Sequence, residues 1–433
     1  MAPTSRERSP ALDAALDAAR WLESVAVPEP YGLLWEPDPR QPALPHLDLS
    51  LYHGVSGVAL FFSALFESTG DTSHRRLAMG AGDTLLERLD DDPLEAGLYS
   101  GAAGIGASLL ELWRATGDAR FRDGAAAVVE SLRRTARPAG AGVDWNESTD
   151  IVSGSAGIGL FLLAAADRLG SAPARELAAA AGRRLVELGR TAPGGLRWAM
   201  TPDFPRTMPN FSHGTAGVAY FLATLHRDTV SPPADGGAFL DAALAGARHL
   251  TTIAEGADGG ESGELCLIYH HEPGGEDLHY LSWCHGPAGT ARLFHRLHEI
   301  TGDSEWRNWV ERSARAVLES GIPEARTPGY WNNVSQCCGA AGVLDFSLSL
   351  YRATGEERYL DFARRVGVDI VQRGTTDAGG LAWIQAEHRL QPELLVAQTG
   401  YMQGAAGVGM ALLRLHLVEQ GRDVAGRLPD SPW

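Results

Sequence analysis

The sequence predicts an all-α fold: an α/α toroid, or double-layered barrel, with seven inner helices surrounded by seven outer helices. Three observations predict it. A Gly-x-x-Gly pattern returns seven times along almost the whole chain. A mostly apolar segment follows each copy, and an amphipathic segment with charges on one side precedes each copy. The alternation of the two segment types indicates a ring of helix pairs.

The apolar segments form the predicted inner set. The residues directly before the first glycine of the seven copies are His53, Ser100, Ser153, His213, His285, Cys338 and Gln403. Successive copies start between 47 and 72 residues apart, which is too irregular for a solenoid of identical units but suits helix pairs joined by variable loops. Segments such as VALFFSALFES and GLFLLAAADRLG are apolar nearly all round, which is typical of helices buried on most faces.

The amphipathic segments form the predicted outer set, at residues 11–24, 74–90, 119–137, 174–190, 238–255, 304–320 and 357–373. A short turn leads from an inner to an outer helix and recurs as STGD, ATGD, ITGD and ATGE. Glycine suits the left-handed position after a helix, and the acidic residue can cap the next helix. The segments GGLRWAM and GGLAWIQAEH, near Leu196 and Leu381, are predicted to be short β-hairpins at one end.

The two sets of helices predict how the chain closes. Joining the ends into a ring buries the inner set against the outer set and against itself, whereas an open superhelix would leave two terminal repeats that need polar caps. We therefore expect one toroid domain over residues 1–433, with residues 1–10 disordered and residues 256–280 forming a loop insertion.

Composition excludes several classes of function. The formal charge of −17 argues against binding to nucleic acid, because phosphate backbones require a basic surface. All 37 basic residues are arginine, which excludes Schiff-base lysine chemistry and a P-loop. No signal-peptide pattern and no apolar run of about 18 residues is found, so no membrane span is expected. Four cysteines are too few for a disulfide framework in a chain of this length, and we expect a soluble cytoplasmic protein.

The glycine pairs predict where polar groups gather. Glycine inside a helix costs about 1 kcal/mol relative to alanine, so a steric reason is needed, and close approach at a crowded ring centre provides one. The residue before the first glycine should then lie near the N-terminus of an inner helix and face the centre. Free N–H groups and the helix dipole favour negative charge there and lower the pKa of a thiol.

Three of the four cysteines fall in this register. Cys338 occupies the position before the glycine, while Cys284 and Cys337 come one residue earlier in their copies. A toroid brings adjacent copies side by side, so the three thiols can form a zinc site that keeps a fourth place open for substrate. The alternative is that they are ordinary buried thiols. Cys266 lies outside the register and is predicted to be a core or loop thiol.

Histidines and one aspartate add to the predicted site. The position before the glycine holds His53, His213 and His285, of which only one or two can be functional. Three further histidines, His270, His271 and His279, fall in the acidic insertion and are expected to be solvated. Asp150 precedes the third copy by three residues, where it can cap the inner helix or belong to the site.

The motifs SHG, WCHGPAG and CCG within this sevenfold repeat resemble those of the lanthionine synthetase C family, which includes lanthipeptide cyclases and the eukaryotic LanC-like proteins. The resemblance covers nearly the whole chain and implies an α/α toroid with one zinc ion per chain. It implies that Cys284, Cys337 and Cys338 are the zinc ligands, although most relatives have histidine at the last position. The tandem cysteines resemble the all-cysteine ligand set of some bifunctional synthetases.

The resemblance also implies a reaction: Michaelis addition of a peptide cysteine thiol to a dehydroalanine or dehydrobutyrine of the same peptide, giving a thioether ring. His213 matches the family's catalytic histidine, and Asp150 matches an aspartate that relays a proton or orients that histidine. One feature departs from the family. Many members carry an arginine shortly before the W-C motif, but here the approach reads EDLHYLSWC, and His279 or Tyr280 is a candidate substitute.

The implied partners are a dehydrated precursor peptide and a separate dehydratase, or a kinase and lyase, because the toroid leaves no room for a dehydrating domain. Three alternatives stay open. The protein can add glutathione to dehydroamino acids in proteins, as the eukaryotic relatives do, or it can be a non-catalytic zinc toroid that scaffolds a peptide-modifying complex. An α/α-barrel glycosidase is disfavoured, because it needs two facing carboxylates and only Asp150 lies near the centre.

Overall fold

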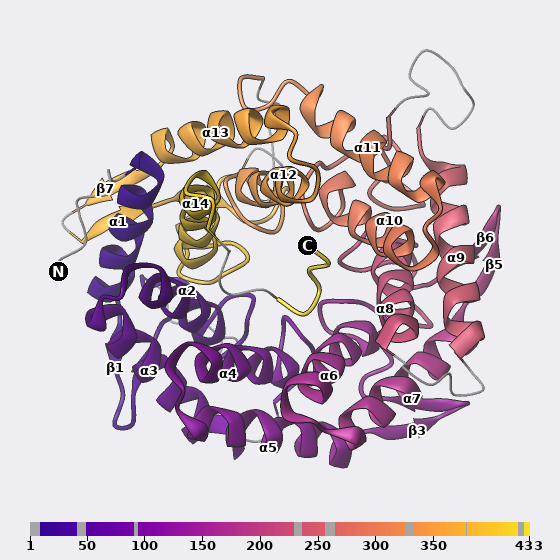
Figure 1. The fold of residues 1–433 in the computed structure, drawn as a ribbon, viewed down its shortest axis with the longest axis horizontal. Coiled ribbons are helices and arrows are strands. Elements are labelled where there is room, and N and C mark those ends of the chain that lie inside the picture. The colour runs from indigo at the N-terminus through magenta and orange to yellow at the C-terminus, as the bar shows by residue number, and fades with distance from the viewer. Residues whose placement is uncertain are drawn as a thin grey trace.

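Two concentric rings of helices build the protein in the computed structural model, which describes residues 9–40, 49–90, 94–228, 236–255, 265–325, 333–377, 379–422 and 428–433 (Figure 1). The outer helices are α1 (Pro10–Ser24), α3 (Thr72–Glu87), α5 (Ala119–Thr135), α7 (Ala172–Leu188), α9 (Gly236–Ile253), α11 (Ser304–Leu318) and α13 (Glu357–Gln372). The inner helices are α2 (Val55–Thr69), α4 (Ala102–Thr116), α6 (Ser155–Leu169), α8 (Thr215–Asp228), α10 (Pro287–Thr301), α12 (Ala340–Thr354) and α14 (Ala405–Glu419).

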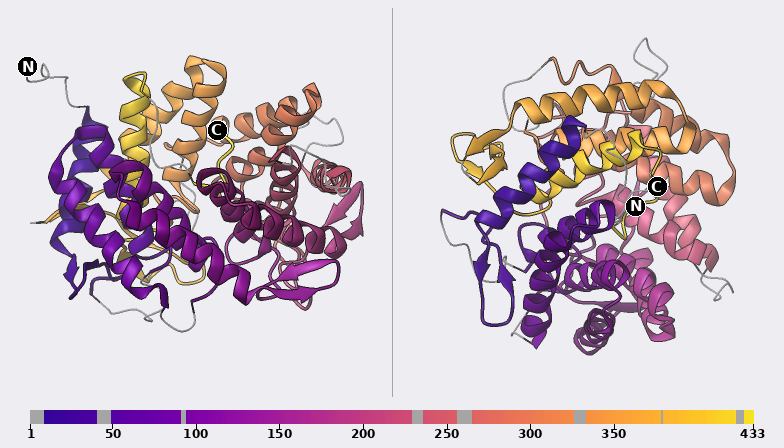
Figure 2. Two further views of the ribbon diagram at one scale, coloured as in Figure 1. Left: turned by 60° about the horizontal axis from the view of Figure 1, so that its bottom comes forward. Right: turned by 60° about the vertical axis from the view of Figure 1, so that its left-hand side comes forward.

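The inner ring is closed. Each inner helix contacts the next, from α2 through α4, α6, α8, α10 and α12 to α14, and α14 returns to contact α2. Helix α1 packs on α14 and α13, so the outer ring closes as well, and Figures 1 and 2 show the circle from three directions. The predicted α/α toroid is confirmed and the open superhelix is wrong. The predicted disorder of residues 1–10 falls largely outside the described residues, which begin at residue 9.

Burial separates the two rings as their sequences predict. In α2 every residue from Val55 to Leu65 is buried, whereas α13 buries one side, with Tyr359, Phe362 and Val366 among the buried residues. A helix that is apolar all round is removed from water only when other elements cover it on all sides. The inner ring therefore forms the core, and the outer ring shields it. No helix in the described segments is long and apolar enough to cross a membrane.

The inner-to-outer turns form as expected, with one exception. Gly70 takes a left-handed conformation with φ of 72°, and the side chain of Asp71 accepts a hydrogen bond of 2.8 Å from the amide of Ser73 at the start of α3. The same arrangement recurs after α4 and α10. In the ATGE copy the side chain of Glu356 makes no capping hydrogen bond, so the predicted acidic cap is wrong there. The longer glutamate side chain is a poorer cap than aspartate.

Short antiparallel hairpins decorate the ring, and those predicted near Leu196 and Leu381 are confirmed. The pairs are β1 (Val27–Pro28) with β2 (Leu33–Leu34), β3 (Arg137–Ala139) with β4 (Gly142–Asp144), β5 (Arg190–Ala192) with β6 (Gly195–Arg197), β7 (Thr375–Asp377) with β8 (Gly380–Ala382), and β9 (Ile384–Ala386) with β10 (Leu395–Ala397). Four of the hairpins have a tryptophan beside them, whose indole N–H donates a hydrogen bond to a carbonyl near the end of the preceding outer helix. These residues are Trp35, Trp145, Trp198 and Trp383. These bonds satisfy carbonyl groups that a helix end leaves free.

The seven loops that lead into the inner helices are joined by backbone hydrogen bonds into a second, smaller ring. The amide-to-carbonyl pairs are Tyr52 to Tyr99, Tyr99 to Val152, Ile151 to Ser212, Ser212 to Cys284, Cys284 to Cys337, Cys337 to Met402, and Met402 to Tyr52, at 2.8–3.1 Å. The ring places equivalent residues of neighbouring repeats side by side. Two of the predicted zinc ligands, Cys284 and Cys337, are consecutive members of it.

Candidate metal centre and active site

The glycines of the repeat fold each loop tightly against its own inner helix. Gly286 is the N-cap of α10, so the first glycine lies before the helix rather than inside it. A Cβ atom at the second glycine, Gly289, would lie 1.9 Å from the carbonyl oxygen of Trp283. The predicted steric role is confirmed, but the close neighbour is the loop that precedes α10. The side chain of Phe211, in the loop before α8, would lie 2.8 Å from the added Cβ atom. Glycine thereby holds Cys284 over the start of α10.

The three predicted cysteines form one buried cluster. Sγ of Cys338 lies 3.3 Å from Sγ of Cys284 and 3.3 Å from Sγ of Cys337, and all three sulfurs lie within 4.8 Å of one another. None of them is in a disulfide. Among the described residues this is the one group of three histidine, cysteine or acidic side chains close enough to share a metal ion. Cys266 is buried elsewhere, and burial raises its pKa to about 11.

The donor set of this cluster suits a zinc ion. Sulfurs bound to zinc at about 2.3 Å in a tetrahedron lie about 3.8 Å apart, which the observed spacing accommodates. Burial opposes a charge on Cys337, but hydrogen bonds from Cys284, Cys338 and Tyr52 outweigh it and hold the pKa of that thiol well below its ordinary value. A buried thiol whose ionised form is favoured, beside two further thiols, suits a cation that prefers sulfur.

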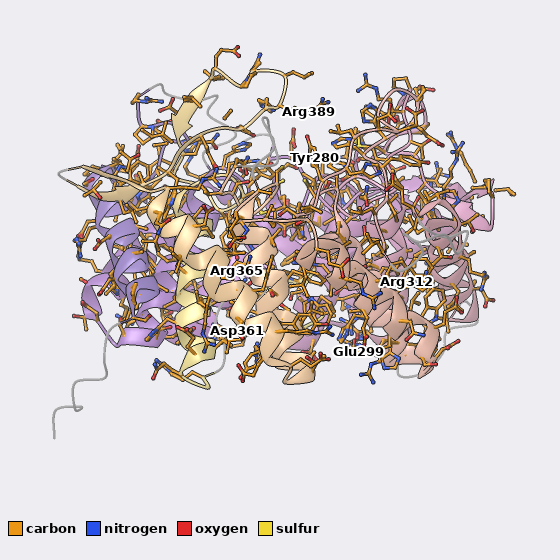
Figure 3. The ribbon with its side chains drawn as sticks, turned by 90° about the horizontal axis from the view of Figure 1, so that it is seen from above. Tyr280, Glu299, Arg312, Asp361, Arg365 and Arg389 are labelled. Carbon is orange, nitrogen blue, oxygen red and sulfur yellow. The ribbon has the colours of Figure 1, made fainter. Side chains whose placement is uncertain are left out.

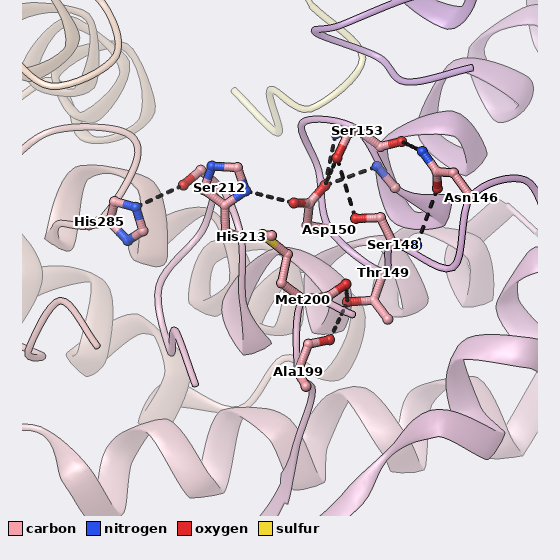
Figure 4. A network of polar contacts seen from close by, with 11 residues as sticks. Asn146, Ser148, Thr149, Asp150, Ser153, Ala199, Met200, Ser212, His213 and His285 are labelled. Atoms are coloured by element: carbon pink, nitrogen blue, oxygen red, sulfur yellow. Dashed lines mark hydrogen bonds and ion pairs between the residues drawn. The ribbon is translucent and has the colours of Figure 1, made fainter. Parts of the chain in front are cut away.

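Asp150 joins two neighbouring repeats (Figure 4). Its carboxylate is fully buried, and one oxygen, Oδ1, accepts hydrogen bonds of 2.8 and 2.9 Å from the amides of Ser153 and Gly154 at the start of α6. The other oxygen, Oδ2, lies 2.6 Å from Nδ1 of His213. One side chain therefore caps the inner helix, as one of the two interpretations predicts, and also contacts His213 of the next repeat.

The electrostatics of His213 follow from this pair. Burial works against protonation of the imidazole, but the charge and hydrogen bond of Asp150 outweigh it, so the pKa of His213 is raised above its ordinary value of 6.5. Asp150 is fully buried, whereas the side chain of His213 is 31% exposed. Because Nδ1 is bound to the carboxylate, Nε2 is the nitrogen left for other partners. The pair with Asp150 thus favours the protonated form of His213, which can donate a proton through Nε2.

One cavity of about 520 Å³ brings these groups together. It is lined by Tyr52, Val152, Ser212, His213, His270, Tyr280, Trp283, Cys284, His285, Cys337, Cys338, His388, Arg389, Leu390 and Gln391. Asp150 stands behind His213 and is not part of the wall. The described residues of the wall include no aspartate or glutamate. The cavity therefore combines three thiols, several imidazoles and a single guanidinium.

His285 differs from His213 although both occupy the same repeat position. Its ring stacks on that of His270 with centroids 3.8 Å apart, and Nε2 lies 3.4 Å from the hydroxyl of Ser212. Burial, followed by the neighbouring histidines, lowers the pKa of His285 well below 6.5, and burial also lowers that of His270 to about 3. Both imidazoles are therefore neutral at physiological pH. His53 pairs with Glu387 at 3.2 Å and does not line the cavity.

The insertion reaches the site, contrary to the expectation of solvated histidines. His270 lines the cavity and His271 is buried, because residues 265–280 fold back against the loop ring. The antiparallel bridge between Thr207 and Glu272 fixes this fold. His279 is 23% exposed and does not line the cavity, and its Nε2 lies 3.0 Å from the carboxylate of Glu255. The part of the predicted insertion at residues 256–264 lies outside the described residues.

Two further groups at the site were not predicted. Asp430 is fully buried in the middle of the ring, where it accepts hydrogen bonds of 3.0 Å from the indole of Trp283 and 2.8 Å from the guanidinium of Arg292. Arg389 lines the cavity from the segment between β9 and β10, at the same end of the toroid as Tyr280 (Figure 3). Neither residue belongs to the repeat, so no pattern in the sequence pointed to them.

Comparison with known proteins agrees with this architecture. The family model of lanthionine synthetase C-like proteins matches residues 45–422. Nisin cyclase superposes with a TM-score of 0.63 at 16% identity, over 95% of this chain and 95% of that chain. An α-mannanase of Bacteroides thetaiotaomicron superposes with a TM-score of 0.51 at 9% identity, over 95% and 96% of the two chains. A cellobiose 2-epimerase of Spirochaeta thermophila gives 0.50 at 15%, over 96% and 100%.

The three structural likenesses show a shared α/α toroid. Their sequence identities are too low for a comparison of function. The family model covers most of the chain, including the whole repeat from His53 to Gln403. On this ground, the chain belongs to the family of lanthionine synthetase C-like proteins.

Proposed function

We propose that the protein is a zinc-dependent lanthipeptide cyclase. It joins a cysteine thiol of a dehydrated precursor peptide to a dehydroalanine or dehydrobutyrine of the same peptide and so forms a lanthionine or methyllanthionine ring. The observation that carries the proposal is that three clustered thiols and an imidazole with a raised pKa line one cavity. Membership of the family and the nisin cyclase fold support it.

Cys284, Cys337 and Cys338 would hold one zinc ion through their sulfurs. A zinc ion bound there would offer an open coordination place to the substrate thiol and lower the pKa of that thiol. The cavity reaches the surface at His388, Arg389, Leu390 and Gln391, which are exposed residues of its wall, so a peptide can enter from that side.

His213 supplies the proton that completes the addition. The sulfur forms a bond to the β carbon, the carbon–carbon double bond breaks, and its electron pair leaves an enolate that must be protonated at the α carbon. Nε2 of His213 is free to donate this proton, while Asp150 holds Nδ1 and stabilises the imidazolium. The proton released by the thiol returns to His213 through solvent, so no proton is consumed overall. His285 is a poorer proton source, because its low pKa leaves the imidazole neutral, without the proton to donate.

The substrate must arrive already dehydrated, so a separate dehydratase, or a kinase and lyase, is the proposed partner. Free thiols persist in reducing compartments, and we place the reaction in the cytoplasm. A glycosidase remains disfavoured, because the described residues of the cavity wall provide no pair of carboxylates.

The test is ring closure in a synthetic peptide that contains one cysteine and one dehydroalanine. Ring closure leaves the mass unchanged but removes the thiol, so the product no longer reacts with N-ethylmaleimide in mass spectrometry. Zinc-loaded wild type should close the ring well above the rate in buffer, and His213→Asn should bind zinc and peptide but lose the reaction.

Adding glutathione to the same assay separates the alternatives. A peptide that gains the mass of glutathione faster than it cyclises would identify an intermolecular thiol transferase. A zinc-loaded protein that binds the peptide and promotes neither reaction would identify a scaffold and overturn the proposal.

A further inference from the structure

The segment between β9 and β10 lies across the outer side of the cavity and is fixed at both ends. At one end, the carboxylate of Glu387 lies 3.2 Å from Nε2 of His53 and accepts a bond of 2.7 Å from the amide of Gln398. At the other end, Arg40 donates a bond of 3.0 Å to the carbonyl of Leu395. Residues 388–391 between these anchors form part of the cavity wall.

Among the described residues of this wall, Arg389 is the one side chain whose positive charge does not depend on pH. The chain contains no lysine, and Arg389 is the single arginine among the described residues that line the cavity. Burial raises the pKa of the phenol of Tyr280, a buried residue four positions before Cys284, and the nearby charge of Arg389 partly offsets that rise. Figure 3 shows both side chains at the same end of the toroid. The guanidinium and the three thiols therefore line the same cavity.

The proposed reaction creates a charge that needs such a group. When a thiol adds to a dehydroamino acid, negative charge develops on the carbonyl oxygen of that residue. Three thiolate ligands would outweigh the charge of a bound zinc ion and leave the site negative, so this oxygen requires donors placed in advance. Arginine presents several N–H groups in one plane and keeps its charge at any working pH.

We propose that Arg389, together with the hydroxyl of Tyr280, binds the carbonyl oxygen of the dehydroamino acid and holds the negative charge that develops there. The inference rests on the proposed function and names a substrate-binding residue for it.

A second observation places the substrate peptide against the same segment. Among the described residues, seven large apolar side chains are exposed, and four of them lie here: Ile384, Leu390, Leu394 and Leu395. Leu390 is 81% exposed and borders the cavity next to Arg389. Exposed apolar side chains that gather beside a cavity are typical of a contact surface. A peptide that reaches the thiols from this side would cover them.

The experiment measures ring closure of the peptide with one cysteine and one dehydroalanine by zinc-loaded wild type, Arg389→Ala and Arg389→Lys. The matched control is Arg365→Ala, an exposed arginine on α13 that pairs with Glu324 far from the cavity. We expect Arg389→Ala to lower kcat about 10²–10³-fold, with unchanged zinc content and a smaller change in KM. Arg389→Lys should recover part of the loss, and the control should match wild type.

Chemical rescue distinguishes a direct role from a structural one. Added guanidinium ion should restore part of the activity of Arg389→Ala and leave wild type and Arg365→Ala unaffected. If Arg389→Ala closes the ring at the wild-type rate, or loses zinc together with activity and is not rescued, the role of Arg389 is wrong while the cyclase proposal stands. If wild type itself closes no ring, the cyclase proposal fails and the role of Arg389 fails with it.

Discussion

Oδ2 of Asp150 lies 2.6 Å from Nδ1 of His213, while Oδ1 of the same carboxylate caps helix α6. The cap fixes the position of the carboxylate through the backbone, so the orientation of His213 is determined by secondary structure. The neighbouring repeat supplies the histidine, so the pair forms only when the ring brings the two loops together. The proposed proton donor, His213 paired with Asp150, therefore depends on the closed arrangement of the repeats.

Asp150→Asn separates the two tasks of this carboxylate. The amide oxygen can still cap α6, but it no longer stabilises the charge on His213, and burial then lowers the pKa of His213. We expect kcat for ring closure to fall about 10²–10⁴-fold. Because the protonated acid is lost as pH rises through its pKa, the decline of kcat at high pH should move to lower pH. A decline at the wild-type pH would contradict the role of Asp150.

Cys338→His tests whether the negative charge of the third thiolate speeds ring closure. The substitution removes one negative charge from the ligand set, so a substrate thiolate should be held more tightly and be less nucleophilic. Ring closure at saturating peptide should become slower, while the variant still binds about one zinc ion per chain. Measurement of kcat at matched zinc content checks this. An unchanged or higher kcat would show that the charge of the ligand set does not limit the reaction.

Gly289→Ala tests the packing that positions Cys284. The new Cβ atom would meet the carbonyl oxygen of Trp283 at 1.9 Å, so the loop with Cys284 must move. We expect a loss of about 1–3 kcal/mol in the free energy of unfolding and weaker zinc binding, measured by urea denaturation and chelator competition. In the control Gly237→Ala the Cβ atom would meet nothing within 4 Å. Equal effects in both variants would refute the steric account.

Asp430→Ala should destabilise the centre of the ring. Arg292 would lose its partner in a pair whose side chains are 11% and 0% exposed, and the indole of Trp283 would lose its acceptor. Breaking a buried ion pair costs about 3–5 kcal/mol. The control Asp361→Ala breaks an exposed pair with Arg364 on α13 and should cost at most about 1 kcal/mol. Similar unfolding midpoints in urea for the two variants would contradict this prediction.

The sequence repeat predicts those parts of the fold and site that depend on register. Glycine pairs recur at the start of each inner helix, so they mark equivalent positions even where loop lengths vary, and closure of the ring makes neighbours of adjacent copies. This is why the clustering of Cys284, Cys337 and Cys338 could be predicted although Cys284 and Cys337 are distant in sequence.

The groups that could not be predicted come from outside the repeat. His270 and Arg389 reach the cavity on irregular segments whose paths depend on tertiary contacts, such as the bridge from Glu272 to Thr207 and the pair of Glu387 with His53. Asp430 enters the middle of the ring without any periodic signal. Long-range contacts of single side chains leave no pattern in one sequence.

Zinc content tests the central claim, a three-thiolate metal site in the cavity, most directly. Elemental analysis should find about one zinc ion per chain in wild type. The ion should be lost or strongly weakened in Cys284→Ala, Cys337→Ala and Cys338→Ala, and retained in Cys266→Ala, which removes a buried thiol away from the cluster. Wild type that holds no zinc, or a set of variants that all retain it, would contradict the account. Retention in Cys338→Ala alone would assign the third ligand to another side chain, with His285 the first to test.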